Sequence, residues 1–557
     1  MFLFDLFRSF LPLHNPIGFG AADFIEFSLA TMLVLMIALR KRVEATARRL
    51  AERPLWAMTF LALLPIALRL ALLPRFPAPT PSGADDFSYL LLGDTLAHLR
   101  MANPSHALHQ FFEAVFILQQ PTYSSIFPMG QGLALAFGQI LGHPWIGVIL
   151  AVGALSAFCY WMLRGWTTPG WALTGGVLAA LEFGPLCQWM NLYWGGAVSA
   201  VAGCLVCGAL PRLSRSPSTR NAALLGCGLG LQLLTRPFEF ALLAIAAAMF
   251  LAAHWRRVLQ ALPVVAVTLL PAVSLTLAQN KGVTGSWTTL PYMLSRYQYG
   301  VPASFTFQPN PLPHRALTPE QDLDYRAQSI VHGEGSDSAS HYMGRLGERL
   351  HFYRFFFYPP LLLALPALLA ASAARRRDLL WAVGVVLLFT LGDNFYPYFY
   401  PHYVAALTCV FVMASVAALE CLGRWQAGRA AASIVVMLTI AHFLFWFGMR
   451  CGNQTLLFTA ARYDTADFIN FGDAEGRARI NGQLAALAGK HLVFVRYGPQ
   501  HLFHEWIHNA ADIDGADVVW AADLGYDQNQ ALLEYYPTRR AWLVKPDAQP
   551  PQLEPYP

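Results

Sequence analysis

The chain has 557 residues, of which 56% are hydrophobic and only 13% are charged, against about 25% charged in an average soluble domain. Apolar runs of roughly 20 residues recur along it, and each is long enough to cross the hydrocarbon layer of a membrane as a helix. This composition excludes a soluble fold. The arginines stand in short clusters between the runs, not on a basic face with interleaved aromatic residues, so we expect no nucleic-acid partner.

The hydropathy pattern predicts an all-α polytopic membrane protein with about twelve transmembrane helices. The expected spans are residues 23–40, 55–74, 146–164, 171–190, 195–211, 221–235, 237–254, 258–279, 354–373, 379–393, 402–420 and 430–449. Residues 40–53 contain six Lys and Arg, whereas residues 75–130 contain only Arg75 and Arg100. Because short basic loops stay in the cytoplasm, we expect a multi-pass protein of the bacterial inner membrane with both termini and the large loops outside.

The lengths of the outer segments predict the domain organisation. We expect a transmembrane domain over residues 1–450, with outer loops at 75–145 and 280–353 that are too long to be simple connectors. Residues 451–557 are less hydrophobic and alternate strand-like with helix-like runs, which predicts a small periplasmic α/β domain. The strand-like runs are 491–497, 517–525 and 540–545, and the helix-like runs are 477–487 and 528–536.

An acidic pair, Asp85 and Asp86, precedes an amphipathic stretch in which Tyr89, Leu92 and Leu96 recur at helical spacing. An aspartate at the start of a helix can serve as its N-cap, which stabilises the helix by about 1 kcal/mol. A second adjacent carboxylate adds like-charge repulsion, which makes sense where one carboxylate acts as a base or a metal ligand. The residues alone leave the capping and the catalytic interpretations open.

The order of features around this pair is similar to that of a known superfamily. Arg69 lies near the outer end of a span, Asp85-Asp86-Phe87-Ser88-Tyr89 follows, and a Tyr-x-x-x-x-Pro-x-Gly turn occupies residues 123–130. A short apolar helix over 131–142 and a span ending at Arg164 come next. Together these features resemble the GT-C integral-membrane glycosyltransferases, particularly the protein O-mannosyltransferase and lipid A aminoarabinose-transferase branches.

The resemblance implies an inverting transferase that moves a sugar from a polyprenyl-phosphate-linked donor to a lipid, glycan or protein acceptor at the outer membrane face. It assigns Asp85 as the catalytic base, with Asp86 in support. It identifies no certain cofactor and leaves a divalent cation open. The residues that we expect to bind substrate are Arg69, Tyr89, Glu113, Tyr123, Gln131, Asn191, Arg236, Arg296, Arg345 and His402.

Two positions depart from the pattern of these relatives. They often carry a lysine in the turn before the proline, whereas Ser125, Ile126 and Phe127 precede Pro128 here. The turn at residues 188–196 lacks the second carboxylate found in one branch. The chemistry still requires cationic groups near the base, because charge develops on the departing phosphate. For this role we expect Arg296 and Arg236.

Three other functions are compatible with parts of the sequence. A transporter or flippase of lipid-linked sugars would also span the membrane many times, although two related halves would then be expected. A glycan ligase or polymerase would take a whole lipid-linked glycan in place of a single sugar. A zinc-dependent membrane protease is a remote alternative, because His504-Glu505-Trp506-Ile507-His508 spells the HExxH motif.

Overall fold

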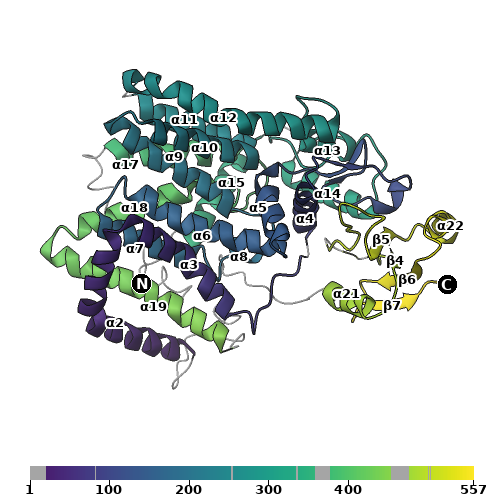
Figure 1. Ribbon diagram of the computed structural model, residues 1–557, viewed down its shortest axis with the longest axis horizontal. Coiled ribbons are helices and arrows are strands. Elements are labelled where there is room, and N and C mark those ends of the chain that lie inside the picture. The colour runs from purple at the N-terminus through teal and green to yellow at the C-terminus, as the bar shows by residue number, and fades with distance from the viewer. Residues whose placement is uncertain are drawn as a thin grey trace.

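The computed structural model describes residues 21–557 except residues 82, 253–254, 334–336, 358–376, 453–475, 500 and 502–503. A body of helices forms most of the molecule, and a small sheet with its own helices lies at one end, close to the C-terminus (Figure 1). The predicted fold, a mostly helical multi-span membrane protein followed by a C-terminal sheet, is confirmed at this level.

Eleven of the twelve predicted spans coincide with helices. These are α2 (Ala21–Ala51), α3 (Pro54–Ala71), α6 (Pro144–Leu163), α7 (Pro169–Glu182), α9 (Ala197–Arg215), α10 (Thr219–Thr235), α11 (Pro237–Ala252), α12 (Trp255–Thr284), α17 (Arg377–Asp393), α18 (Thr408–Leu422) and α19 (Gln426–Cys451). Within the described residues, six helices are long and apolar enough to cross a membrane, judged by length and composition. The predicted span 354–373 lies mostly outside the described residues, so twelve crossings stays a prediction.

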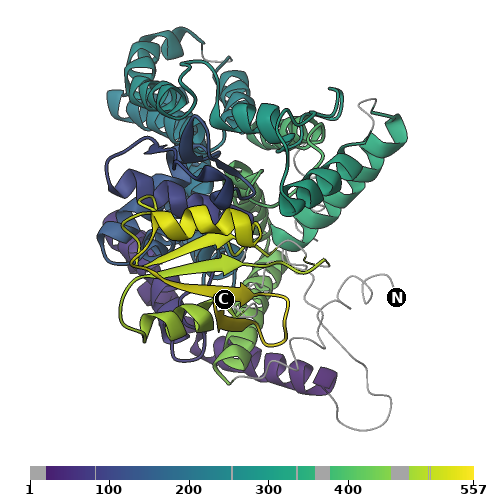
Figure 2. The same ribbon diagram turned by 90° about the vertical axis from the view of Figure 1, so that its right-hand side faces the viewer.

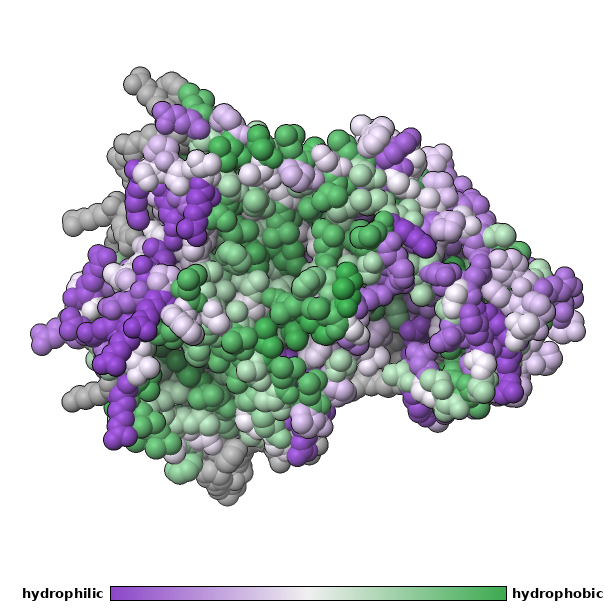
Figure 3. All heavy atoms as spheres, viewed as in Figure 1, coloured by the Kyte–Doolittle hydropathy of each residue, from purple (hydrophilic) through white to green (hydrophobic). Residues whose placement is uncertain are grey.

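The surface of the helical body carries a broad apolar belt. Figure 3 shows this belt across the middle of the molecule, with hydrophilic side chains at the end away from the sheet and over the sheet itself. Large apolar side chains of the body, such as Leu63 of α3 and Val267 and Leu270 of α12, are more than half exposed. A belt of this kind matches the hydrocarbon layer in which a polytopic protein lies.

Close backbone contacts bring the helices of the body together. A Cβ atom at Gly147 of α6 would lie 1.8 Å from the carbonyl oxygen of Ala134 in the short helix α5 (Met129–Ile140). A Cβ at Gly203 of α9 would lie 2.1 Å from the carbonyl oxygen of Ala406 in the 3-10 turn η3 (Ala405–Leu407). Only glycine permits these approaches, which let small-residue faces pack as membrane helices do.

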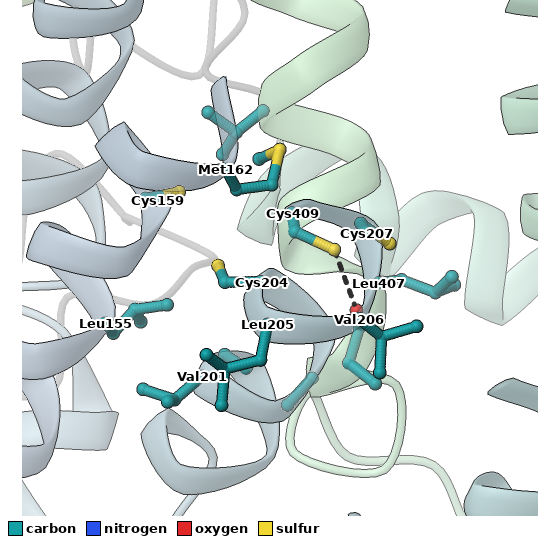
Figure 4. Close-up of a cluster of buried hydrophobic side chains, with 14 of the residues drawn as sticks. Leu155, Cys159, Met162, Val201, Cys204, Leu205, Val206, Cys207, Leu407 and Cys409 are labelled. Carbon is teal, nitrogen blue, oxygen red and sulfur yellow. Dashed lines mark hydrogen bonds between the residues drawn. The ribbon is translucent and has the colours of Figure 1, made fainter. Parts of the chain in front are cut away.

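Four thiols lie in the interior of the body, as Figure 4 shows. Cys159 comes from α6, Cys204 and Cys207 from α9, and Cys409 from α18, and all four side chains are almost fully buried. The thiol of Cys409 donates to the carbonyl oxygen of Ala406 at 3.2 Å. Buried cysteines surrounded by leucine, valine and methionine act as small apolar side chains in such a core.

The first outer loop folds into helices and a small sheet. Helix α4 (Ala84–Ala97) begins at the acidic pair, as predicted, and the predicted short apolar helix is α5. Between them lie the 3-10 turn η2 (His109–Phe112) and three short antiparallel strands in the order β1–β3–β2, namely β1 (Asn103–Pro104), β2 (Ile117–Leu118) and β3 (Thr122–Ser125). The second outer loop contributes α13 (Pro291–Tyr299), α14 (Pro319–His332) and α15 (Ala339–Phe356), and α8 (Gln188–Asn191) is a single turn between α7 and α9.

We call residues 476–557 the tail unit. Its sheet has the strand order β5–β4–β6–β7, with β4 (His491–Val495) parallel to both β5 (Val518–Ala522) and β6 (Arg540–Lys545), and β7 (Gln552–Pro555) antiparallel to β6. The two helices, α21 (Arg477–Ala485) and α22 (Tyr526–Tyr535), cover opposite faces of the sheet (Figure 2). The three predicted strands and both predicted helices are present, and β7 was not predicted.

The two faces of this sheet belong to different cores. Val493 and Val495 pack with Ile480 and Leu484 of α21 on one face. Leu492 and Phe494 point the other way, because side chains alternate along a strand. On that face they share one apolar cluster with first-loop residues, which include Phe111, Phe112, Ile117 and Tyr123. The tail unit is therefore docked on the first outer loop through a common core.

We expect Leu492→Ala to destabilise the tail unit by about 2–5 kcal/mol, because it leaves a cavity beside a fully buried position. Hydrogen exchange of the β4 amides in the full-length protein in detergent measures the loss. Leu487→Ala is the matched control, since Leu487 is 37% exposed in the same segment and its truncation should change stability by less than about 0.5 kcal/mol. Equal losses in both variants would contradict the shared core.

Candidate active site

The two carboxylates in the first turn of α4 differ in burial and in hydrogen bonding. Gly83 is the N-cap of the helix, and no side chain caps it, so neither aspartate has the capping role. Asp86 is buried, and its Oδ1 atom accepts a hydrogen bond of 2.9 Å from the backbone N–H of Tyr193. Asp85 remains partly exposed. The pair thus consists of one carboxylate that fixes the helix and one that is accessible.

The segment that holds Asp86 is itself fixed from several sides. The carbonyl oxygen of Tyr193 accepts from Gln131 Nε2 at 2.9 Å, and its hydroxyl donates to the carbonyl oxygen of Pro79 at 2.8 Å. Arg69 is fully buried, and its Nε donates to Asn191 Oδ1 at 2.8 Å. Arg69, Gln131 and Asn191 are thus brought together around the Tyr193 backbone, where they support the position of Asp86.

The residues after the acidic pair hold α4 to the rest of the first outer loop. The hydroxyl of Ser88 donates to the carbonyl oxygen of Phe116 at 2.7 Å. The ring of Tyr89 stacks on Phe127, with 4.2 Å between the ring centroids and an interplanar angle of 6°. These contacts leave little freedom for the turn that carries Asp85, because a buried polar group is costly to detach from its partner.

The surroundings of Asp85 favour its protonated form near neutrality. Burial, followed by the negative charges of Asp86 and Asp324, raises the pKa of Asp85 to about 7, and the positive charge of Arg236 opposes this rise. Asp324 comes from α14 in the second outer loop, and Arg236 from the turn between α10 and α11. Three separate parts of the chain therefore converge on this carboxylate, and a base that titrates near the operating pH is well suited to proton transfer.

Arg236 is held beside an aromatic ring and a glutamate. Its NH1 atom lies 3.4 Å from Glu239 Oε1, and the guanidinium lies 4.2 Å from the ring centroid of Tyr403. Arg236 is the C-cap of α10, and Pro237 begins α11. The helix break therefore places the cation between the C-terminus of α10 and the N-terminus of α11. A partly exposed arginine held in this way can bind an anion in two-point fashion.

The charges of both Arg236 and Arg296 act on Tyr396. Burial raises the pKa of Tyr396 to about 12, while Arg296 and Arg236 lower it and Glu239 and Asp85 raise it. The phenol thus lies within the electrostatic reach of the expected base and of both expected phosphate ligands. Arg296 in α13 is fixed by hydrogen bonds of 3.0 Å from its Nε and NH2 atoms to the carbonyl oxygens of Pro302 and Ala303.

Glu113 and Arg345, two further residues of the predicted site, make contacts between and within the loops. Glu113 accepts from the hydroxyl of Tyr299 at 2.9 Å, which links the first and second outer loops. Arg345 of α15 bonds to Asp337 and donates from Nε to the carbonyl oxygen of Asn394 at 3.1 Å.

Two aromatic residues of the predicted site, His402 and Tyr123, contact other parts of the chain. His402 packs against the rings of Trp194 and Tyr400. The hydroxyl of Tyr123 donates to the carbonyl oxygen of Asn509 in the tail unit at 3.0 Å.

Several residues near Asp85 were not predicted. Tyr193 acts through its backbone N–H, which leaves no side-chain signal in a sequence. Asp324 lies in an ordinary polar helix, and the sequence does not reveal that the second outer loop folds toward the first. Tyr396 and Tyr403 belong to an aromatic turn that reads equally well as a membrane-interface belt. Arg349, buried in α15, positions Tyr396 by donating to its carbonyl oxygen at 2.6 Å.

The tail unit reaches the same turn of α4 through the segment that spells HExxH. Residues 504–510 form no helix, so His504 and His508 do not share the helical face that a zinc protease needs. The ring of His508 instead stacks on Phe87 at a centroid distance of 4.0 Å. Over the described part of the chain, no group of three or more His, Cys, Asp or Glu side chains is arranged to hold a metal ion.

Comparison with known proteins gives a fold-level match. No protein-family model and no curated protein matches the sequence. ArnT from Cupriavidus metallidurans in the apo state matches with a TM-score of 0.50 and 13% identity, over 88% of this chain and 92% of that chain. The chain has the GT-C fold. The sequence-based resemblance to this superfamily is therefore confirmed at the level of the fold.

Two further solved structures are similar to a lesser degree. ArnT from the same organism bound to undecaprenyl phosphate matches with a TM-score of 0.45 and 12% identity, over 88% of this chain and 93% of that chain. The archaeal oligosaccharyltransferase AglB from Archaeoglobus fulgidus, in complex with an inhibitory peptide and a dolichol-phosphate, matches with a TM-score of 0.44 and 10% identity, over 88% of this chain and 69% of that chain.

We expect Asp86→Leu to lower the free energy of unfolding by about 1–3 kcal/mol, because the buried N–H of Tyr193 would lose its acceptor. Asp86→Asn keeps an oxygen at the same place and should retain most of the stability. Thermal unfolding of the purified protein in detergent measures both variants. If the asparagine and leucine variants unfold at the same temperature, the hydrogen bond does not have this anchoring role.

Proposed function

We propose that the protein is a glycosyltransferase that moves a sugar from a polyprenyl-phosphate-linked donor to an acceptor at the outer face of the membrane, with inversion at the anomeric carbon. The observation that carries the proposal is the partly exposed carboxylate of Asp85, within the field of Arg236, on a GT-C fold. The ArnT fold has also been solved with undecaprenyl phosphate bound, which is the kind of donor carrier that we assign to this chain.

In the proposed reaction, Asp85 accepts the proton of the acceptor hydroxyl as the hydroxyl oxygen attacks the anomeric carbon. The bond between this carbon and the phosphate oxygen breaks, and the bonding electrons leave with the polyprenyl phosphate. Arg236 and Arg296 stabilise the negative charge that develops on the phosphate. Electrostatic stabilisation of this kind commonly supplies the largest part of a rate enhancement.

The proposal includes the orientation and the division of the chain. The first and second outer loops and the tail unit lie on the periplasmic side, with the transmembrane domain over residues 1–450 and the outer domain over 451–557. A transporter or flippase would not need an activated carboxylate with a phosphate-binding cation in an outer loop. A ligase or polymerase of whole glycans would use the same site, and the activity with a monosaccharide phosphate lipid separates it from the proposed transferase.

We expect Asp85→Asn to reduce turnover by roughly 100- to 10,000-fold, the usual effect of losing a general base. Transfer from an undecaprenyl-phosphate sugar in proteoliposomes measures it, with Asp322→Asn on the exposed face of α14 as the control. Full activity of Asp85→Asn would contradict the assignment.

The pH dependence of the rate provides a second test of this base. Asp85 must be ionised to accept a proton, and its pKa is about 7, so the wild-type rate should rise with pH through this value and then level off. A raised pKa disfavours folding once the carboxyl ionises, so stability should fall as the pH rises from about 4 through 7. Asp85→Asn should remove this fall and be more stable than the wild type at pH 8.

We expect Arg236→Gln to weaken the binding of undecaprenyl phosphate by roughly 10- to 100-fold, because a charge-assisted hydrogen bond contributes about 1.5–3 kcal/mol. Arg236→Lys keeps the charge and should lose less. Native mass spectrometry of the detergent-solubilised protein measures the bound fraction, with Arg326→Gln on the outer face of α14 as the control. Unchanged binding in Arg236→Gln would place the phosphate elsewhere.

A further inference from the structure

A surface pocket of about 390 Å³ lies where α6 and α18 end. It is lined by Trp166, Thr167 and Thr168 from the connection between α6 and α7, and by Glu420 and Arg424 at the end of α18. Helix α6 starts shortly after the outer-loop helix α5 and is long and apolar enough to cross a membrane. Its last residue, Leu163, therefore lies at the opposite membrane face, so the pocket is separate from the candidate active site.

The pocket contains one acidic and one basic side chain that do not pair with each other. A glutamate and an arginine four positions apart on a helix usually attract each other across one turn. Here α18 ends at Leu422 with Gly423 as its C-cap, so Arg424 lies beyond the last turn, and no ion pair joins it to Glu420. Two opposite charges therefore line one pocket without neutralising each other.

The carboxylate of Glu420 is fixed by the backbone at the start of α7. Its side chain is buried, and its Oε1 atom accepts a hydrogen bond of 3.2 Å from the backbone N–H of Thr168. Thr168 is the N-cap of α7 but makes no capping bond with its own side chain, so the carboxylate takes the place of a capping group. A carboxylate has two oxygens and about four acceptor sites. Glu420 can therefore hold the N–H groups of a cation while it keeps this bond.

A buried carboxylate without a cationic partner is unfavourable, and buried charges in proteins are normally paired. Within the part of the chain that the structure describes, Glu420 forms no ion pair with an arginine, lysine or histidine. Its position in the wall of a pocket indicates that a cationic group of a ligand is the missing partner.

Trp166 forms a fixed aromatic wall of the same pocket. Its ring stacks on Trp381, with 5.8 Å between the ring centroids and an interplanar angle of 8°. Its indole N–H donates to the carbonyl oxygen of Cys207 at 3.0 Å. An indole beside a carboxylate favours an alkylammonium group, because aromatic rings attract organic cations.

The pocket lies at the level where the membrane meets water. Helix α6 and the segment Ala405–Leu422 are both candidate spans, and the lining residues lie at or just beyond their ends. Trp425, the residue after Arg424, is 69% exposed, and exposed tryptophans are typical of the membrane surface. Figure 3 shows hydrophilic side chains beyond the apolar belt, at the end of the body away from the tail unit. A phospholipid headgroup fits this level better than a soluble zwitterion does.

We propose that this pocket binds the headgroup of a phospholipid that carries both a phosphate and a primary ammonium group, in the leaflet opposite the candidate active site. The ammonium donates to Glu420, and the phosphate accepts from Arg424. A headgroup with only negative charge is repelled by Glu420, and a quaternary ammonium has no N–H to donate to it. Such a lipid joins the ends of α6, α7 and α18, and the proposal does not depend on the transferase function.

Matched substitutions at the two charges test this site. Glu420→Gln keeps an oxygen for the N–H of Thr168, and Arg424→Gln removes an exposed cation. Glu52→Gln and Arg429→Gln are the controls, because both residues are exposed and lie outside the lining. The probe is dioleoyl phosphatidylethanolamine, compared with dioleoyl phosphatidylglycerol and dioleoyl phosphatidylcholine, and native mass spectrometry of the full chain in detergent measures the bound fraction.

We expect the wild type and both controls to bind phosphatidylethanolamine about tenfold more tightly than either of the other lipids. Glu420→Gln should lose the preference over phosphatidylglycerol, because only the cation remains. Arg424→Gln should bind phosphatidylethanolamine about tenfold more weakly than the wild type. Thr168→Trp, which fills the pocket from an exposed position without removing a side-chain bond, should lose as much even if a charge variant folds poorly. Equal undecaprenyl phosphate binding in all these proteins shows that they are folded.

Three results would overturn the proposal. The first is equal binding of phosphatidylethanolamine and phosphatidylglycerol by the wild type. The second is a loss in Arg429→Gln as large as that in Arg424→Gln, which would indicate a general effect of surface charge. The third is full displacement of the lipid by equimolar glycerophosphoethanolamine, which would make the soluble headgroup alone the ligand.

Discussion

The hydrogen bond from the backbone N–H of Tyr193 to Asp86 is the contact on which the geometry of the site depends. A buried carboxylate without a partner is unfavourable by several kcal/mol, so Asp86 ties the start of α4 to the turn between α7 and α9. Arg69 and Gln131 fix that turn from two further elements. The neighbouring carboxylate, Asp85, is then presented at a defined place without a capping role of its own.

The second outer loop and the tail unit both act on the helix turn that carries Asp85. Asp324 of α14 raises the pKa of Asp85, and the ring of His508 and the guanidinium of Arg477 both pack against Phe87. Burial, followed by the charge of Glu320, raises the pKa of Glu505 to about 8. His508 and Glu505 of the segment that spells a metalloprotease motif therefore take part in the packing and in the electrostatics of this interface.

The helices and strands that leave a regular apolar pattern in the sequence were predicted correctly. The spans, α4, α5 and three strands of the tail sheet follow from apolar runs and alternation. The two-residue strands of the first loop are too short to leave a pattern, and β7 contains a proline that argues against a strand. The site was predicted less well, because Tyr193 contributes a backbone amide and because contacts such as Glu113 with Tyr299 join loops that are far apart in the sequence.

The core shared by the first outer loop and the tail unit has a consequence for biosynthesis. Tyr123 and Asn509 are hydrogen-bonded at a sequence separation of 386, and Asp94 and Ala511 at a separation of 417. A ribosome makes about 5–20 residues per second, so the first loop is made some tens of seconds before the part of the tail unit that it packs against. Until then Phe111 and Phe112 have no sheet to pack against. The first loop therefore exposes this apolar surface until the tail unit has been made.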